Sequence, residues 1–396
     1  MTGSVHGSPM DGETILSLCC ELVGMRSENP PGDVRAPAAV ARAFLERYGL
    51  TVTEVAHIDQ KPNLVATIEG VSAGRHLVLN GHLDTIGPGE TADWSVPPFE
   101  ATRRDGRIYG LGAGNMKGGV AALIAAFAHL AQRRDMFRGR VSLTLVADET
   151  VFGPDGAGYL LEQRPDLVGD GVICGEGPGA MALGLAEKGL LWLEMSCRVP
   201  SGQGMLTTAG ASAIARLASI LLEVDRLNDL YVTPPAALSS LAAHGGEHGF
   251  RLSANAGTIR GGRFVSQKAD IAVAEVDFRV PPGLTIDEVE RRVRDICGGK
   301  AEIRRIKGWE PNWCSPSDHL SKAVAAAAQS VLGRESPPVV RLPASDASRW
   351  RALGIPAVCF GPQPLLASGI DDYVEERDVV ECAAIYARAA IDWLNR

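Results

Sequence analysis

The chain has 396 residues, of which 45% are hydrophobic and 22% charged, and its formal net charge is -8. This length favours two domains over one, and the composition is typical of a soluble globular protein. The acidic balance argues against nucleic acid or an anionic membrane as a partner, and no apolar run reaches the roughly 20 residues that span a bilayer.

Strands and helices alternate along the first half of the chain. Apolar residues at helical spacing predict helices at 12–23, 36–48, 118–131 and 157–163. Short apolar or alternating runs predict strands at 51–55, 64–68, 76–79, 141–146 and 171–174. This alternation indicates an α/β domain with a mostly parallel sheet flanked by helices.

The pattern changes near Gly189. From there to about Trp309 it predicts a first strand and then a helix at 211–224. Two strands at 252–259 and 271–279 and a second helix at 286–296 follow. Strand and helix patterns then resume at 320–332, 357–360 and 379–394. We therefore expect an inserted α+β domain of residues 189–309, which divides the first domain into residues 1–188 and 310–396.

A series of short motifs begins with Gly81-His82-Leu83-Asp84-Thr85 and a glycine-rich run from Tyr109 to Gly118. It continues through Ala147-Asp148-Glu149, Gly175-Glu176-Gly177-Pro178, Asp277-Phe278-Arg279, Ser345-Asp346-Ala347 and Gly354-Ile355-Pro356. In this order the motifs resemble the M20 metallopeptidase family, which includes acetylornithine deacetylases, succinyl-diaminopimelate desuccinylases, aminoacylases and glutamate carboxypeptidases. The resemblance covers nearly the whole chain.

The resemblance implies a catalytic α/β domain and a smaller lid domain that commonly mediates dimerisation, so a homodimer is expected. It also implies two zinc ions bridged by a carboxylate, and a neighbouring Glu that delivers a water molecule to an amide carbonyl. By position, His82 matches a metal ligand and Asp84 the carboxylate that orients its imidazole. Glu149 matches the general base, and Glu176 matches a carboxylate ligand.

Three positions depart from the family pattern. Asn115 stands where the bridging Asp is expected, Thr150 where a metal-binding Glu is expected, and Ser368 where the final His ligand is expected. A neutral amide is a poor bridge between two dications. The sequence therefore predicts that one metal site is lost, and that His82, Asn115 and Glu176 hold at most one zinc or similar divalent ion, or none.

The lid domain departs in the same way. Gln203 occupies the position of a His that reaches the partner subunit's site, and its amide can still donate a hydrogen bond to an oxyanion. Arg263 aligns with a lid Asn that contacts substrate. Arg279 matches a position that meets a substrate carboxylate in some members, although a structural arginine at a strand end is an equal alternative.

Three functions are compatible with these residues. The favoured hypothesis is a diverged enzyme that uses Glu149 as acid and base, with one metal or none, on an amide or related bond of an amino-acid-derived small molecule, by hydrolysis or acyl transfer. The alternatives are an ordinary zinc-dependent deacylase of N-acyl amino acids and a catalytically inactive binding protein. Scattered cysteines and the lack of a secretory signal predict a cytoplasmic protein.

Overall fold

The computed structural model describes residues 11–243, 248–365 and 369–396. The chain forms two compact units. The first contains the residues up to Leu185, together with Cys314–Pro338 and Ser345–Arg396, and the second contains Ala186–Trp313 and Val339–Ala344.

A mixed sheet forms the centre of the first unit, with the strand order β1-β2-β6-β3-β7-β17-β8. The inner strands β6, β3, β7 and β17 are mutually parallel, whereas β1, β2 and β8 pair antiparallel at the two sides. The α/β fold class is therefore confirmed, with the parallel strands at its centre. The strand bounds are β1 Thr53–Val55, β2 Asn63–Glu69, β3 His76–His82, β6 Arg140–Val146, β7 Gly171–Cys174, β8 Leu183–Glu187 and β17 Ala357–Cys359.

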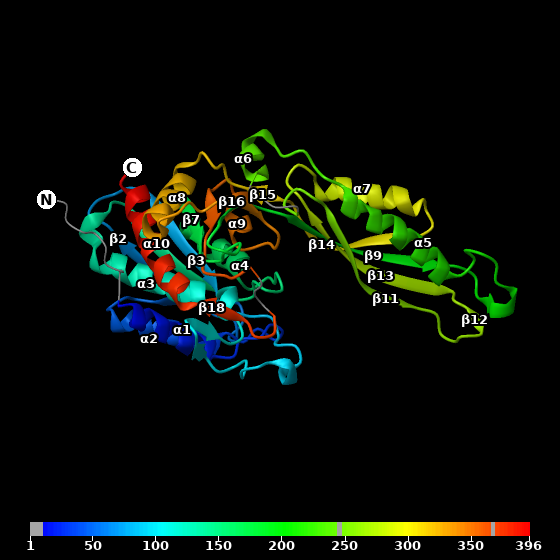
Figure 1. Cartoon of the computed structure of the whole chain (residues 1–396), viewed down its shortest axis with the longest axis horizontal. Helices are drawn as coiled ribbons and strands as arrows, with labels where there is room; N and C mark the ends of the chain where they lie inside the picture. Colours follow the sequence, from blue (N-terminus) through cyan, green and yellow to red (C-terminus); the bar gives the residue numbers. More distant parts are fainter. Residues whose placement is uncertain (1–10, 244–247, 366–368) are drawn as a thin grey trace. The chain divides into compact units, whose positions relative to one another are not determined.

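Helices pack on both faces of this sheet. Trp350 and Leu160 belong to one buried cluster with Val78 on β3. On the opposite face α3 lies beside β3 and α10, as the neighbouring teal and red helices in Figure 1 show. The helix bounds are α1 Gly12–Val23, α2 Arg35–Arg47, α3 Gly118–Gln132, α4 Ala157–Gln163, α8 His319–Leu332, α9 Ala347–Ala352 and α10 Glu376–Leu394.

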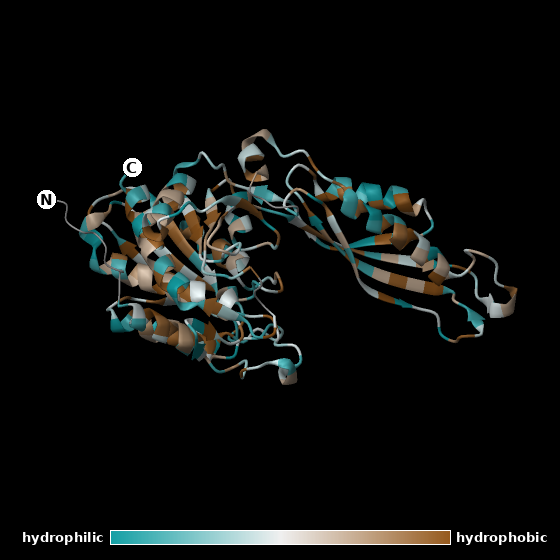
Figure 2. Cartoon of the chain, in the orientation of Figure 1, coloured by the Kyte–Doolittle hydropathy of each residue, from teal (hydrophilic) through white to brown (hydrophobic). Residues whose placement is uncertain are grey.

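Glycine allows α3 to approach the sheet closely. A Cβ atom on Gly119 would lie only 2.2 Å from the carbonyl oxygen of Gly175, so a larger residue at this position would push the helix away. The inner strands are almost continuously buried, as expected for strands covered on both faces, and their apolar residues gather at the centre of the unit (Figure 2). The start of α3 and the end of β7 are thereby held together beside Glu176.

Strand β3 is longer than its apolar run predicts. Pairing with β6 continues from Asn80 through Gly81 to His82, where His82 pairs with Val146. The sequence also did not predict β8, nor a small sheet of β4 (Thr102–Arg104), β5 (Arg107–Tyr109) and β18 (Tyr373–Glu375). The three strands of the small sheet have three residues each and are too short for hydrophobic periodicity to reveal.

The second unit is built on a four-stranded antiparallel sheet with the order β11-β13-β9-β14. Helices α5 and α7 lie over the same face of this sheet (Figure 1). The chain passes between the units at β8, with which β15 and β16 pair. The bounds are α5 Ala213–Asp225, α6 Ser239–Ala242, α7 Ile286–Cys297, β9 Gly189–Arg198, β10 Gly202–Gln203, β11 Ser253–Gly261, β12 Gln267–Lys268, β13 Ile271–Val280, β14 Glu302–Trp309, β15 Asn312–Trp313 and β16 Pro338–Arg341.

None of the helices in the described parts of the chain combines the length and the apolar character that crossing a lipid bilayer requires.

Candidate metal centre

The candidate site lies at the carboxyl ends of the inner strands of the first unit. β3 ends at His82, the segment after β6 carries Glu149, and the segment after β7 carries Glu176. Because parallel strands end at the same edge of a sheet, these three side chains meet there.

His82, Glu149 and Glu176 form a buried group whose candidate ligand atoms all lie within 4.8 Å of one another. The Nε2 atom of His82 is 3.6 Å from Oε2 of Glu149 and 3.3 Å from Oδ1 of Asn115. One imidazole and two carboxylates are ligand types that divalent zinc accepts. Glu149, which the sequence suggests as a base, therefore also lies within reach of an ion held by the other two.

The tautomer of His82 follows from its contact with Asp84. The Nδ1 atom lies 2.9 Å from the backbone carbonyl oxygen of Asp84, and a carbonyl oxygen can only accept a hydrogen bond. Nδ1 therefore carries the proton and donates it. In the neutral ring, Nε2 is left with its lone pair directed toward Glu149 and Asn115, as a metal ligand requires.

The site concentrates buried negative charge. Burial, together with the charge of Glu176, raises the pKa of Glu149 well above its usual value. Burial also raises the pKa of Asp346 to about 7, against the opposing effect of His82. Burial alone would lower the pKa of His82, but the surrounding carboxylates outweigh it and raise that pKa. Acids in such a place are stabilised either by protons or by a cation.

Two buried carboxylate oxygens in this region, Oε1 of Glu149 and Oδ2 of Asp346, have no hydrogen-bond partner among the described residues. Buried polar atoms of this kind usually have a partner, so their presence calls for a group that the protein chain does not supply. A divalent cation fits the donor set of His82, Glu149 and Glu176.

Thr150 points away from this group. Its hydroxyl donates to Oδ2 of Asp84 at 2.7 Å, and its backbone N–H donates to the same oxygen at 3.0 Å. Asn115 lies beside His82, as described above. Ser368 lies outside the described residues.

The remaining expected site residues, Gln203, Arg263 and Arg279, belong to the second unit. Gln203 is exposed on β10, and Arg263 is exposed with its guanidinium 3.6 Å from Asp270. Arg279 donates to Oδ2 of Asp277 at 3.0 Å.

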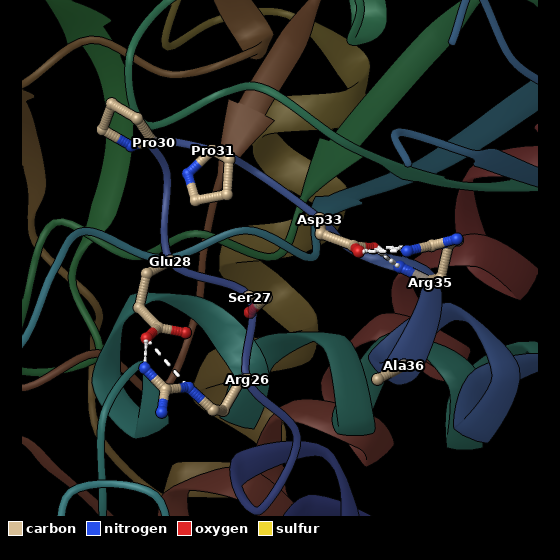
Figure 3. Close-up of a pocket in the computed structure, with 8 residues that line it drawn as sticks. All are labelled: Arg26, Ser27, Glu28, Pro30, Pro31, Asp33, Arg35 and Ala36. Atoms are coloured by element: carbon tan, nitrogen blue, oxygen red, sulfur yellow. Dashed lines mark hydrogen bonds and ion pairs between the residues drawn. The ribbon is translucent and has the colours of Figure 1, made fainter. Parts of the chain in front are cut away.

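A cavity of about 600 Å³ lies along the segment that precedes α2 (Figure 3). Two ion pairs line it, Arg26 with Glu28 and Arg35 with Asp33. Both arginines are thus already matched by a carboxylate within this cavity.

Two further residues belong near the site although sequence reasoning did not assign them a role. Asp346 begins α9, and it influences the pKa of Glu149. Asn29 donates to Asp84 from the N-terminal segment. A signal existed for Asp346, which lies inside one of the quoted motifs, whereas an asparagine before two prolines indicates only a turn.

Comparison with known proteins places these features in context. The family model of peptidase family M20/M25/M40 matches residues 78–392. A probable succinyl-diaminopimelate desuccinylase of Staphylococcus aureus is 27% identical, over 96% of this chain and 97% of that protein.

Solved structures of low sequence identity share the fold. An M20 family metallo-carboxypeptidase from Sulfolobus solfataricus aligns with a TM-score of 0.77 at 20% identity, over 97% of this chain and 99% of that one. A dinuclear metal-binding M20 peptidase from Bacillus subtilis aligns with a TM-score of 0.72 at 14% identity, over 97% of this chain and 98% of that one.

Proposed function

Because the chain belongs to peptidase family M20/M25/M40, we propose that it is a diverged amidohydrolase that cleaves an amide or related bond of an amino-acid-derived small molecule. The observation that carries this proposal is the buried group of His82, Glu149 and Glu176 at the carboxyl ends of parallel strands. The family uses divalent metals, usually zinc.

One divalent ion per chain is the proposed metal content. His82 and Glu176 would hold it, with Glu149 beside them and Asn115 as a weak additional ligand. When bound, the ion supplies Lewis-acid character that polarises a carbonyl oxygen. A second ion lacks support, because Thr150 donates its hydroxyl to Asp84 and Asn115 has no charge with which to bridge two dications.

Glu149 is the proposed acid and base. Its carboxylate takes a proton from the attacking water as the oxygen bonds to the carbonyl carbon. It then gives that proton to the leaving nitrogen as the carbon–nitrogen bond breaks. Glu149 must therefore hold the proton between the two steps. Transfer of the acyl group to an acceptor other than water would use the same proton route.

The substrate class follows from the relatives and from charge. The relative named above is a probable desuccinylase, which supports an N-acyl amino acid as substrate. Arg263 and Arg279 would suit a substrate carboxylate, and Gln203 would donate to an oxyanion across a dimer formed by the second unit. The proposal therefore includes a substrate-binding role for the second unit and a homodimer.

A panel of N-succinyl, N-acetyl and other N-acyl amino acids tests the proposal. The protein is purified without chelator, loaded with one equivalent of zinc, and assayed for release of free amine. We expect turnover of at least one member by the native chain and none by Glu149→Gln. No turnover of any member by zinc-loaded protein would contradict the proposal and favour an inactive binding protein.

A further inference from the structure

The position that resembles a lost metal ligand has a different contact in this chain. Thr150 Oγ1 donates to Asp84 Oδ2 at 2.7 Å, and the carboxylate that receives it is fully buried. We infer that Thr150, together with Asn29, is a positioning residue that holds Asp84, whose backbone carbonyl accepts from Nδ1 of His82 at 2.9 Å and whose Oδ1 lies 3.5 Å from the same nitrogen. This inference rests on the proposed function for its catalytic consequence, but not for its geometry.

One oxygen of Asp84 is saturated by donors. Oδ2 accepts from the Thr150 hydroxyl, from the Thr150 N–H at 3.0 Å, and from Nδ2 of Asn29 at 2.9 Å. These bonds prevent rotation of the carboxylate about its χ2 angle. The other oxygen, Oδ1, accepts from the backbone N–H of Glu149 at 3.2 Å and lies 3.5 Å from Nδ1 of His82. The donors to Oδ2 thus hold in place the residue whose backbone carbonyl accepts from Nδ1 of His82 and whose Oδ1 lies beside the same nitrogen.

The Asp84 side chain is fully buried, and both of its oxygens accept hydrogen bonds from the described residues. A carboxylate acceptor makes each of these hydrogen bonds stronger than a bond between neutral groups.

Asn29 links Asp84 to a second buried acid. Its amide group has two hydrogens, and it donates to Asp84 Oδ2 at 2.9 Å and to Asp148 Oδ1 at 3.0 Å. Lys61 also donates to Asp148 Oδ1 at 2.7 Å and supplies the balancing positive charge. The side chain of Asn29 is thus satisfied by two carboxylates that would otherwise repel each other.

The backbone around Asp148 allows its carboxylate to reach Asn29. Asp148 has φ of 61°, a left-handed conformation that Asp tolerates better than most residues. A Cβ atom on Gly153 would lie 1.8 Å from Asp148 Oδ2, so only glycine leaves room for the carboxylate. Asn29 is itself fixed, because its backbone N–H donates to the carbonyl of Thr85 at 2.7 Å.

A purely structural network would stabilise the fold without affecting His82. The two roles are separated by Thr150→Val, which removes the hydroxyl at nearly constant shape, and by Thr150→Ser, which restores it. Thr144→Val is the matched control, because Thr144 is a buried threonine on β6 whose hydroxyl contacts Asn80 and Leu79 instead of Asp84.

The direct readout is the Nδ1–H resonance of His82 in metal-free protein labelled with ¹⁵N-histidine, assigned by its absence in His82→Asn. We expect a downfield, exchange-protected signal in the native chain, in Thr150→Ser and in Thr144→Val. Thr150→Val and Asn29→Ala should show faster exchange or loss of the signal. Zinc affinity, measured by competition with a chelator, should fall about 10- to 100-fold in Thr150→Val and recover in Thr150→Ser.

An unchanged His82 signal and unchanged zinc affinity in Thr150→Val would overturn the inference. Loss of the signal in Thr144→Val as well would also overturn it, because the effect would then be general to the sheet. If the native chain binds no zinc but the His82 signal still depends on Thr150, the positioning role stands and the proposed metal-dependent function fails.

Discussion

Asp84 and Glu149 are buried acids that follow neighbouring parallel strands, but their surroundings are opposite. The Oδ2 atom of Asp84 accepts hydrogen bonds from Asn29 and Thr150, and its carboxylate has a pKa of about 2. Glu149 has a buried oxygen without a hydrogen-bond partner among the described residues, and its pKa is raised. The surroundings of Asp84 therefore stabilise the charged carboxylate, whereas those of Glu149 favour the protonated form.

This difference assigns a positioning role to Asp84 and a chemical role to Glu149. A carboxylate with a pKa of about 2 stays charged near neutral pH, so Asp84 suits orientation of a neighbouring group. An acid with a raised pKa and a free oxygen is suited to proton transfer or to contact with a cation. The contrast predicts that substitutions at the two positions will affect different properties of the protein.

Glu149→Gln should give the largest loss of activity. Without the carboxylate no group takes the proton from water, so kcat should fall by about 10²- to 10⁴-fold. The melting temperature should stay equal or rise, because an unsatisfied buried acid is replaced by a neutral amide. Assay of the best N-acyl substrate and calorimetry measure the two effects. A clear loss of stability would contradict the proposed environment.

Asp84→Asn, in contrast to Glu149→Gln, should destabilise the fold. Replacing the carboxylate weakens the bonds from Asn29 and Thr150, so the free energy of unfolding should fall by about 3 kcal/mol. Urea unfolding of this variant beside Glu149→Gln measures the difference. Equal stability of the two variants would remove the distinction between the two acids.

Lys61→Met tests the hydrogen bonds that hold Asp148 and Asp155. Lys61 donates to both Asp148 and Asp155, so its loss leaves two buried carboxylates without this cation. The free energy of unfolding should fall by about 2 kcal/mol, because the buried carboxylates lose a charged hydrogen-bond donor. Lys300→Met, at an exposed position, is the control and should change stability little. Similar stability of the two variants would show that Lys61 does not support the network.

At neutral pH, substitution of His76, at the opposite end of β3 from His82, should have the smallest effect on stability. Burial and the charge of Arg140 lower its pKa to about 4 from an ordinary value near 6.5. The unfolded chain therefore binds a proton first as pH falls, and this group makes the fold less stable between about pH 6.5 and 4. His76→Gln should flatten the pH dependence of urea unfolding in that window. An unchanged slope would contradict this assignment.

The sequence predicts the fold more fully than the site. Hydrophobic periodicity places α1, α4 and β7 with the observed bounds, because each buries a regular pattern of apolar residues. Hydrophobic periodicity does not predict short strands such as β5, because their pairing depends on other segments of the chain.

Site contacts across long sequence separations could not be predicted from one sequence. Motifs indicate His82, Glu149 and Glu176, but they carry no information on the direction of the Thr150 hydroxyl. Nor could they show that Asn29, 55 residues before Asp84, would donate to it. Such contacts depend on how loops after different strands meet, which local pattern does not encode.

The metal content of the native protein tests the proposed single-ion site. Protein purified without chelator, then equilibrated with excess zinc and desalted, is analysed by ICP-MS beside Glu176→Ala. We expect one zinc per chain in the native protein and a marked loss in Glu176→Ala. Two zinc ions per chain would contradict the proposed single-ion site and restore the ordinary two-metal hydrolase, and no zinc would remove the metal from the mechanism.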